Sequence, residues 1–178
     1  AHIAAKNHAN AVPNEYAQFR EPISVQDALE APPVADPLHL YDACPITDGA
    51  SAIVFVSESY AVDNDIDAPV TVTGAGQGSD RLALADRADL TRTPAAIDAA
   101  ETAYDAAGIE PEDVDVAEVH DCFTIAEVLA IESLGLAEPG AGIAAARDGV
   151  TTADGDCPVN LSGGLKAKGH PVGATGGS

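Results

Sequence analysis

Two short motifs contain the side chains best suited to acid–base chemistry, and the first is HDCF at residues 120–123. The preceding residues, 114–119, alternate apolar and acidic positions and predict a strand. Thr124 with Glu127 forms a capping-box pattern, which predicts a helix that ends near residue 135. Ligands of open α/β sheets bind beyond the carboxyl end of a strand, so the motif occupies a position suited to a functional site.

The cysteine of this motif is a candidate for proton transfer. Cys122 lies just before the predicted helix N-terminus, whose partial positive charge favours a thiolate. We therefore expect a lowered pKa, with an unremarkable buried cysteine as the alternative. Cys44 and Cys157 are each followed by proline ahead of a predicted strand, and we interpret both as structural. Because the three cysteines lack CxxC spacing, we expect reduced thiols, without a disulfide framework or a metal site.

The second motif is a histidine among glycines, in SGGLKAKGHPVGATGG at residues 162–177. Glycine lets the backbone approach a ligand closely, and Pro171 restrains the chain beside His170. A structural histidine is the alternative, although this segment offers few bulky side chains for the ring to pack against. Lys166 and Lys168 are two of only eight basic residues, so an anionic ligand nearby is compatible with the segment.

The strands expected to position these motifs are those of an α/β protein. Apolar runs at 50–56 and 69–73 predict strands buried on both faces, and a short strand is expected from Cys157 into the following glycines. Residues 1–37 are polar and interrupted by prolines, which predicts a segment without long regular elements. GAGQG at 74–78 lacks the full GxGxxG spacing, so nucleotide binding there is not the favoured interpretation.

Further helices have clear start and stop signals. Thr93 as N-cap and Pro94 at the first helical position predict a helix that continues to residue 107 and ends at Gly108. A short helix is expected at 143–147. In a strand–helix repeat, the final PVGATGGS would open one more helix, but we expect the sequence to stop before that helix can be built.

The composition limits the expected partners and location. The chain has 178 residues, 29 acidic and 8 basic, with a formal net charge of −21, so nucleic-acid binding is not expected. The few lysines, many aspartates and abundant alanine are typical of a halophilic protein whose self-repulsion is screened by salt; some other acidic bias is the alternative. No apolar run has the length of a membrane span and no signal-peptide pattern begins the chain, so we expect a cytoplasmic protein without a membrane partner.

The chain resembles thiolases in four segments that follow the family's order: NEYAQFR at 14–20, ITDGASAIVFVSE at 46–58, HDCFTIAEVLAIESLGL at 120–136 and VNLSGGLKAKGHPVGATG at 159–176. HDCF in place of the NEAF of ordinary thiolases is similar to the sterol-carrier-protein-type thiolases and the archaeal acetyl-CoA acetyltransferases. The resemblance implies an α/β thiolase fold with α-β-α-β-α layers, of which this chain holds the end of the first half and most of the second.

The resemblance also implies a division of the chain. Residues 1–40 would form a covering or connecting segment, and 41–73 the end of the N-terminal thiolase half. Residues 74–178 would form the C-terminal thiolase domain, truncated before its last helix and hairpin.

The resemblance implies catalytic roles for three residues. His170 would activate the nucleophilic cysteine and help to bind the thioester oxygen, and His120 would help to form an oxyanion hole for the acetyl-CoA enolate. Cys122 would be the acid–base thiol. The contacts with the coenzyme A thioester, which is substrate rather than cofactor, are expected from Ser162, Gly163, Gly164 and Phe123.

The attacking cysteine of thiolases belongs to a CxS-type motif in the first half, and none of the three cysteines here has that context. We therefore expect a fragment of an acyltransferase that catalyses CoA-dependent Claisen condensation or thiolysis and is inactive alone. The alternative is a non-catalytic CoA-binding or scaffold subunit that completes a split thiolase or an acyl-CoA multienzyme complex. The resemblance implies a homo-oligomer, dimer or tetramer, for the intact enzyme, with other acyl-CoA enzymes as further candidate partners.

Overall fold

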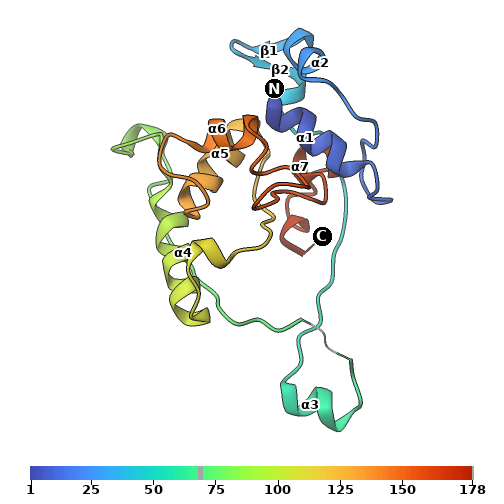
Figure 1. Ribbon diagram of the computed structural model, residues 1–178, viewed down its shortest axis with the longest axis vertical. Helices are drawn as coiled ribbons and strands as arrows, with labels where there is room; N and C mark the ends of the chain where they lie inside the picture. Colours follow the sequence, from blue (N-terminus) through green and yellow to red (C-terminus); the bar gives the residue numbers. More distant parts are fainter. Residues whose placement is uncertain (68–69, 178) are drawn as a thin grey trace.

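The structure, a computed structural model, describes residues 1–67 and 70–177; its regular elements are mainly helices, joined by long irregular segments (Figure 1). Its helices and strands are α1 (His2–Ala11), α2 (Val25–Glu30), β1 (Pro33–Ala35), β2 (Leu38–His39), α3 (Glu58–Asp63), α4 (Pro94–Ala107), α5 (Thr124–Ser133), α6 (Gly142–Arg147) and α7 (Gly164–Lys168). Single 3₁₀ turns lie at Leu40–Asp42, Leu84–Asp86, Pro111–Asp113 and Thr175–Gly177. β1 and β2 pair antiparallel in a two-stranded sheet. None of the helices in the two described ranges combines the length and apolarity that crossing a membrane requires.

Helix α1 was not expected from the sequence. The prolines begin only at Pro13, after the helix has ended at Ala11, so they leave ten residues free to form it. The helix packs against α7, α2, α6 and α5, and most of its side chains are buried. Ile3 forms an apolar cluster with Val128 of α5 and Ala146 of α6. A segment interpreted as lacking long regular elements therefore supplies part of the core.

Helix α4 has the predicted bounds and the predicted ends. Pro94 is its first residue, and Gly108 follows it with a φ of 69°, in the left-handed region that favours glycine. Thr93 takes the N-cap position, but its side chain makes no capping bond. Its hydroxyl pairs with that of Ser133 instead, and this contact joins the start of α4 to the end of α5.

Helix α5 is confirmed, but its predicted capping box is wrong. Phe123 is the N-cap, and the Thr124 hydroxyl donates to Asp42 Oδ1 at 2.8 Å. Glu127 is buried and binds partners in the interior instead of the helix N-terminus. The predicted short helix at 143–147 is present as α6, and the final segment, as far as residue 177, contains the 3₁₀ turn Thr175–Gly177 in place of a full helix, as expected.

The two predicted buried strands at 50–56 and 69–73 are absent from the described residues. Val54 is 86% exposed and Phe55 is 73% exposed, and residues 70–73 are likewise irregular; Ala68 and Pro69 lie outside the described ranges. In Figure 1 this part of the chain runs away from the other helices to α3 and returns. A β-prone segment fits a pleated surface but does not create one, and no described residue pairs with either run.

The other two strand predictions are recovered as a single parallel contact. Ala117 bridges Val159, and Ala117 N donates to Pro158 O at 3.0 Å while Asn160 N donates to Ala117 O at 2.8 Å. The chain entering HDCF therefore runs beside the chain entering the glycine-rich motif, in the same direction. This short contact places the two motifs side by side.

The glycines of GAGQG let the chain lie directly on α4. A Cβ atom at each would overlap a carbonyl oxygen of that helix, namely Ala103 O for Gly74, Ala99 O for Gly76 and Ala95 O for Gly78. Alternate residues of an extended chain point the same way, and helix residues four apart share a face, so glycines spaced by two meet alanines spaced by four. Close packing accounts for these glycines without a nucleotide.

Gly76→Ala is therefore expected to destabilise the fold. The added methyl group would overlap the Ala99 carbonyl, and relieving that overlap separates the segment from α4 at a cost of about 1–3 kcal/mol. The measurement is urea-induced unfolding. Gly173→Ala is the matched control, since a Cβ atom at Gly173 meets nothing within 4 Å. Equal losses in the two variants would contradict the packing role.

Candidate active site

The interior of the molecule contains a buried carboxylate, Glu127 of α5. Lys6 Nζ lies 2.9 Å from its Oε1, and the side-chain amides of Asn7 and Asn160 donate to its Oε2 at 2.8 and 2.7 Å. Lys6 also donates to Val159 O. A buried carboxylate is tolerated only when it is paired and hydrogen-bonded, and α1 supplies two of the three donors.

A second buried carboxylate, Asp121, caps the short helix α7. It accepts hydrogen bonds from Leu165 N at 2.6 Å, Lys166 N at 3.3 Å and Asn7 Nδ2 at 2.7 Å. A Cβ atom at Gly164, which has a φ of 59°, would overlap this carboxylate. Asp121 directly follows His120 and binds the helix that leads to His170, so it links the two histidine motifs.

Asn160 holds the backbone before His120 in place. Its Oδ1 accepts a hydrogen bond from Val119 N at 2.8 Å while its amide group donates to Glu127. Its own carbonyl accepts from Asn10 Nδ2 at 3.0 Å. Asn160 adopts a φ of 59°, a conformation that asparagine tolerates better than other non-glycine residues.

The two predicted histidines lie together. The rings of His120 and His170 meet edge to face, with centroids 5.1 Å apart and planes at 86°. Both line a cavity of about 370 Å³, whose other walls include Glu118, Leu165 and Lys168. The structure thus brings together two side chains that are 50 positions apart in the sequence.

The neighbours of His170 define which of its nitrogens is free. Its Nδ1 lies 2.8 Å from Thr175 Oγ1, and that hydroxyl donates its own proton to Pro171 O at 3.0 Å. Thr175 Oγ1 therefore accepts from an Nδ1–H group, which leaves Nε2 of the neutral ring as the acceptor. The backbone of His170 bridges Ile46, which fixes the motif against the segment after Cys44.

His120 is kept neutral by its surroundings. Partial burial, together with the nearby His170, lowers its pKa below the ordinary 6.5. A neutral imidazole presents one N–H donor and one acceptor to the cavity.

Cys122 does not have the lowered pKa expected at a helix N-terminus. Burial raises the pKa of its thiol, and the Cys44 thiol adds to the increase; the weaker opposing contribution is a hydrogen bond with the Phe123 backbone. Phe123 is the N-cap, so Cys122 lies outside the first helical turn, within which the effect of the helix dipole is concentrated. The expected thiolate is thus disfavoured in this chain.

The predicted CoA-contact residues fall in two groups. Gly164 lines the cavity with the histidines, and Ser162 lies nearby on Glu118, which accepts from Ser162 N at 2.8 Å and from its hydroxyl at 2.6 Å. Gly163 is buried against Ala11 of α1. Phe123 is 42% exposed and bridges Ala43, and it does not line the cavity.

The thiolase C-terminal domain-like family matches residues 76–176 of the chain. The chain belongs to the thiolase family. It is 47% identical over 176 residues to an acetyl-CoA acetyltransferase of Methanothermobacter thermautotrophicus, covering 99% of this chain and 46% of that protein. It is 36% identical over 180 residues to sterol carrier protein 2 of Rattus norvegicus, covering 99% and 33%. A chain of the Ltp2-ChsH2(DUF35) aldolase has a TM-score of 0.86 at 26% identity, covering 98% of this chain and 47% of that chain.

These likenesses confirm the predicted family and its α/β thiolase fold. They also confirm the resemblance to archaeal acetyl-CoA acetyltransferases and to sterol carrier protein 2. The thiolase chain described here spans less than half the length of the relatives that it matches.

Several residues that support the thiolase motifs were missed in the sequence. The spacing of Lys6, Asn7 and Asn10 could have predicted a polar helix face, because residues three and four apart lie on the same side of a helix. Lys166 is buried, with its Nζ 5.4 Å from the Tyr41 ring centroid, and burial lowers its pKa. Only Lys168 of the two predicted lysines lines the histidine cavity.

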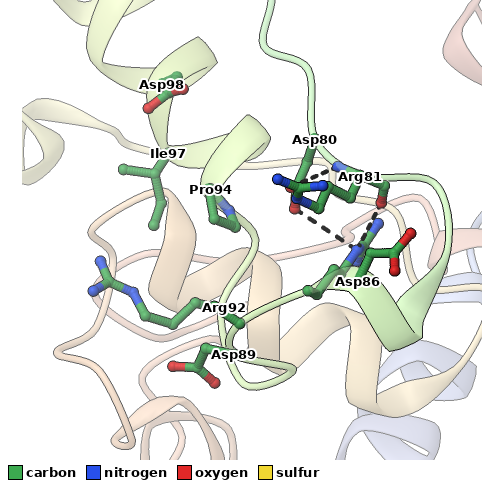
Figure 2. A pocket seen from close by; sticks show the side chains of 10 residues that line it. Asp80, Arg81, Asp86, Asp89, Arg92, Pro94, Ile97 and Asp98 are labelled. Atoms are coloured by element: carbon green, nitrogen blue, oxygen red, sulfur yellow. Dashed lines mark hydrogen bonds and ion pairs between the residues drawn. The ribbon is translucent and has the colours of Figure 1, made fainter.

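A second cavity, of about 660 Å³, lies beside the start of α4 (Figure 2). Its charged lining residues are Asp80, Arg81, Asp86, Arg87, Asp89, Arg92 and Asp98. Arg87 pairs with Asp80 at 3.7 Å and donates to Arg81 O at 3.0 Å. Acidic and basic groups thus alternate, which fits a loop held together by its own charges.

Among residues 1–67 and 70–177, no group of three or more His, Cys, Asp and Glu side chains has a metal-binding arrangement.

The Asp121 carboxylate predicts a specific pH dependence of stability. Burial and the nearby Glu127 raise its pKa from 3.8 to about 6, despite its three hydrogen bonds. The folded chain therefore binds more protons here than the unfolded chain, and stability that is present below pH 3.8 is lost as the pH rises through about 6.

Asp121→Asn should remove this dependence. The weakened cap lowers the free energy of unfolding of the variant by a constant amount at every pH. The original chain loses about 1 kcal/mol more stability than the variant between about pH 5 and pH 7.5, so the difference between the two chains shifts by that amount in favour of the variant. Urea unfolding at both pH values measures the difference. Asp105→Asn, at an exposed position of α4, is the control. The same pH slope in all three chains would show that the carboxyl is not perturbed.

Proposed function

We propose that this chain supplies the His120, Cys122 and His170 part of a thiolase active site. The reaction is CoA-dependent Claisen condensation or thiolysis, as in an acetyl-CoA C-acetyltransferase or a 3-ketoacyl-CoA thiolase. The observation that carries the proposal is the edge-to-face pair of His120 and His170 in one cavity. The likeness to an archaeal acetyl-CoA acetyltransferase supports the acyl-CoA substrate class.

Each histidine suits one step of this chemistry. The Nε2 acceptor of His170 is suited to take the proton of a substrate or enzyme thiol, because Thr175 holds the ring in the required tautomer. The neutral His120 is suited to donate a hydrogen bond to a thioester oxygen as negative charge develops on it. Enolate formation needs such an oxyanion donor together with an acid–base group at the acetyl carbon, which is the role proposed for Cys122.

Cys122 is the proposed acid–base thiol. A thiol with a raised pKa is predominantly protonated at neutral pH, so in this form it is ready to give a proton to a carbanion. Removing a proton from the acetyl group requires the thiolate, which bound substrate and the rest of the enzyme must stabilise. The proposal therefore assigns the donor half of the role to the chain described here.

The nucleophile is proposed to come from residues beyond this chain. Within 1–67 and 70–177, no hydrogen bond joins His170 to a cysteine. We propose that the intact enzyme is a homo-oligomer, dimer or tetramer, working in a salt-rich cytoplasm; the acidic composition supports the saline setting. Ser162, Gly163, Gly164 and Phe123 remain the proposed contacts with the coenzyme A thioester.

A second candidate function is favoured by the likeness to a chain of the Ltp2-ChsH2(DUF35) aldolase. Carbon–carbon cleavage of the aldol type needs acid–base groups and an oxyanion hole but no acyl-enzyme cysteine. The same histidines would then act in a complex with a partner subunit, which is the multienzyme alternative. Transfer of the acyl group to coenzyme A distinguishes thiolysis from aldol cleavage.

In the assembly that carries the nucleophile, His170→Ala should lower kcat for acetoacetyl-CoA thiolysis by about 10² or more, because it removes the base. KM should change less. His2→Ala, an exposed histidine at the start of α1, is the control and should retain activity. Near-normal kcat in His170→Ala, or thiolysis by this chain alone, would contradict the proposal.

Cys122→Ala should separate condensation from acylation. Without the thiol, steady-state condensation is expected to fall by about 10² or more, whereas acyl-enzyme formation on the separate nucleophile is affected less because His170 handles that proton. The measurement compares the acyl-enzyme burst from acetyl-CoA with the condensation rate. Cys157→Ala is the matched control. Small, equal losses in both steps would leave Cys122 a packed thiol.

A further inference from the structure

Cys44 and Cys122 occupy opposite positions on two antiparallel segments. Ala43 bridges Phe123 in antiparallel orientation, so the next residue on one segment faces the preceding residue on the other. The Cys44 N–H donates to the Cys122 carbonyl at 2.8 Å, which confirms this register. Nothing in the sequence indicates this pairing, because the two cysteines are 78 positions apart and Cys44 is followed by proline like a structural cysteine.

This register brings the two side chains to one face. Directly opposed residues of an antiparallel pair have Cα atoms about 4.5–5.5 Å apart, and their side chains point the same way. A disulfide needs Cα atoms about 4.4–6.8 Å apart. The general spacing of such a pair therefore falls within the range that a disulfide needs.

The electrostatic surroundings agree with this proximity. Burial raises the pKa of both thiols, and Cys44 is the second cause of the increase at Cys122. Asp121 raises the pKa of both thiols as well, while Lys166 acts in the opposite direction on Cys44. The surroundings therefore do not stabilise the two cysteines as thiolates. A disulfide formed from such cysteines is harder to reduce than one formed from cysteines with low pKa values.

We propose that Cys44 and Cys122 form a reversible redox pair. A disulfide oxidant such as oxidised glutathione is attacked by one thiolate, releasing one glutathione and leaving a mixed disulfide. The second cysteine thiolate then attacks the protein sulfur, forming the Cys44–Cys122 bond and releasing a second glutathione. Two electrons and two protons pass from the cysteines to the two glutathione molecules, so the reaction is balanced.

The consequence for catalysis rests on the proposed function, although bond formation does not. A Cys122 sulfur bound to Cys44 has no proton to donate, so the oxidised enzyme would lose its acid–base thiol. Cys157 is not part of the pair and belongs to a different segment, in which its N–H donates to Val150 O. Burial and Asp115 raise the pKa of its thiol.

The folded and unfolded chains give opposite predictions for the bond formed. Cys122 and Cys157 are 35 positions apart, whereas Cys44 and Cys122 are 78 apart. Loop-closure entropy favours the shorter loop by about threefold in an unfolded chain. The native register instead favours Cys44 with Cys122.

The test incubates the reduced chain with oxidised glutathione, folded in buffer and unfolded in guanidinium chloride. After acid quenching and alkylation, peptide mass spectrometry identifies the bonds. In the folded chain, alkylatable thiols should fall from three to one, with Cys44 joined to Cys122 and Cys157 alkylated. Cys157→Ser should form the same bond. A folded chain that joins Cys122 to Cys157, or that keeps glutathione on Cys122 while Cys44 stays reduced, would overturn the proposal.

An activity measurement separates this inference from the proposed function. In the assembly that carries the nucleophile, activity should be lost as the Cys44–Cys122 bond forms and should return with dithiothreitol. Cys44→Ser should lose activity more slowly under the same oxidant. Bond formation without loss of activity would contradict the role of Cys122 and leave the redox pair intact. No bond, together with an inactive Cys122→Ala variant, would do the reverse.

Discussion

The cap that Asp121 places on α7 is the interaction on which the arrangement of the site depends. The carboxylate belongs to the same motif as His120, and the helix that it caps leads directly to His170. The spacing of the two rings is therefore set by short hydrogen bonds, and the long connection between the motifs has little influence on it. Asn7 donates to both buried carboxylates, which ties this cap to α1.

The acidic side chains of this chain fall into an exposed set and a buried pair, Asp121 and Glu127, and different groups compensate the two. The net charge of −21 is carried mainly by exposed side chains, whose mutual repulsion salt can screen. Asp121 and Glu127 lie inside, where dissolved ions do not reach them, and amide donors and Lys6 compensate them. The chain has few cations, and Lys6 and Lys166 are both used in the interior. Salt should therefore weaken the repulsion between the exposed carboxylates and leave the geometry of the histidines almost unchanged.

Local signals predicted α4, α5 and α6 but not α1, α2, α3 or α7, and they predicted the strands poorly. Pro94 and Gly108 act through their own backbone conformations, so α4 could be read from its sequence. Val54 and Phe55 favour a strand only when other strands accept them, and the described residues provide none. His120 and His170 were found as motifs, but their contact depends on hydrogen bonds between distant residues. Glu127 was misread because a capping glutamate and a buried one have the same local pattern.

The contact between the GAGQG segment and α4 also has a built-in length. Two residues of extended chain advance about 6.6 Å, whereas four residues of helix advance about 6.0 Å. The glycines and the helix carbonyls therefore repeat at slightly different distances, so they match best at one contact and are increasingly offset on either side of it. Over the three contacts from Gly74 to Gly78 the drift reaches about 1.2 Å, and all three glycines still meet a carbonyl oxygen of the helix. Each further contact would add about 0.6 Å of mismatch, so the pattern suits a short contact that positions one helix better than a long seam.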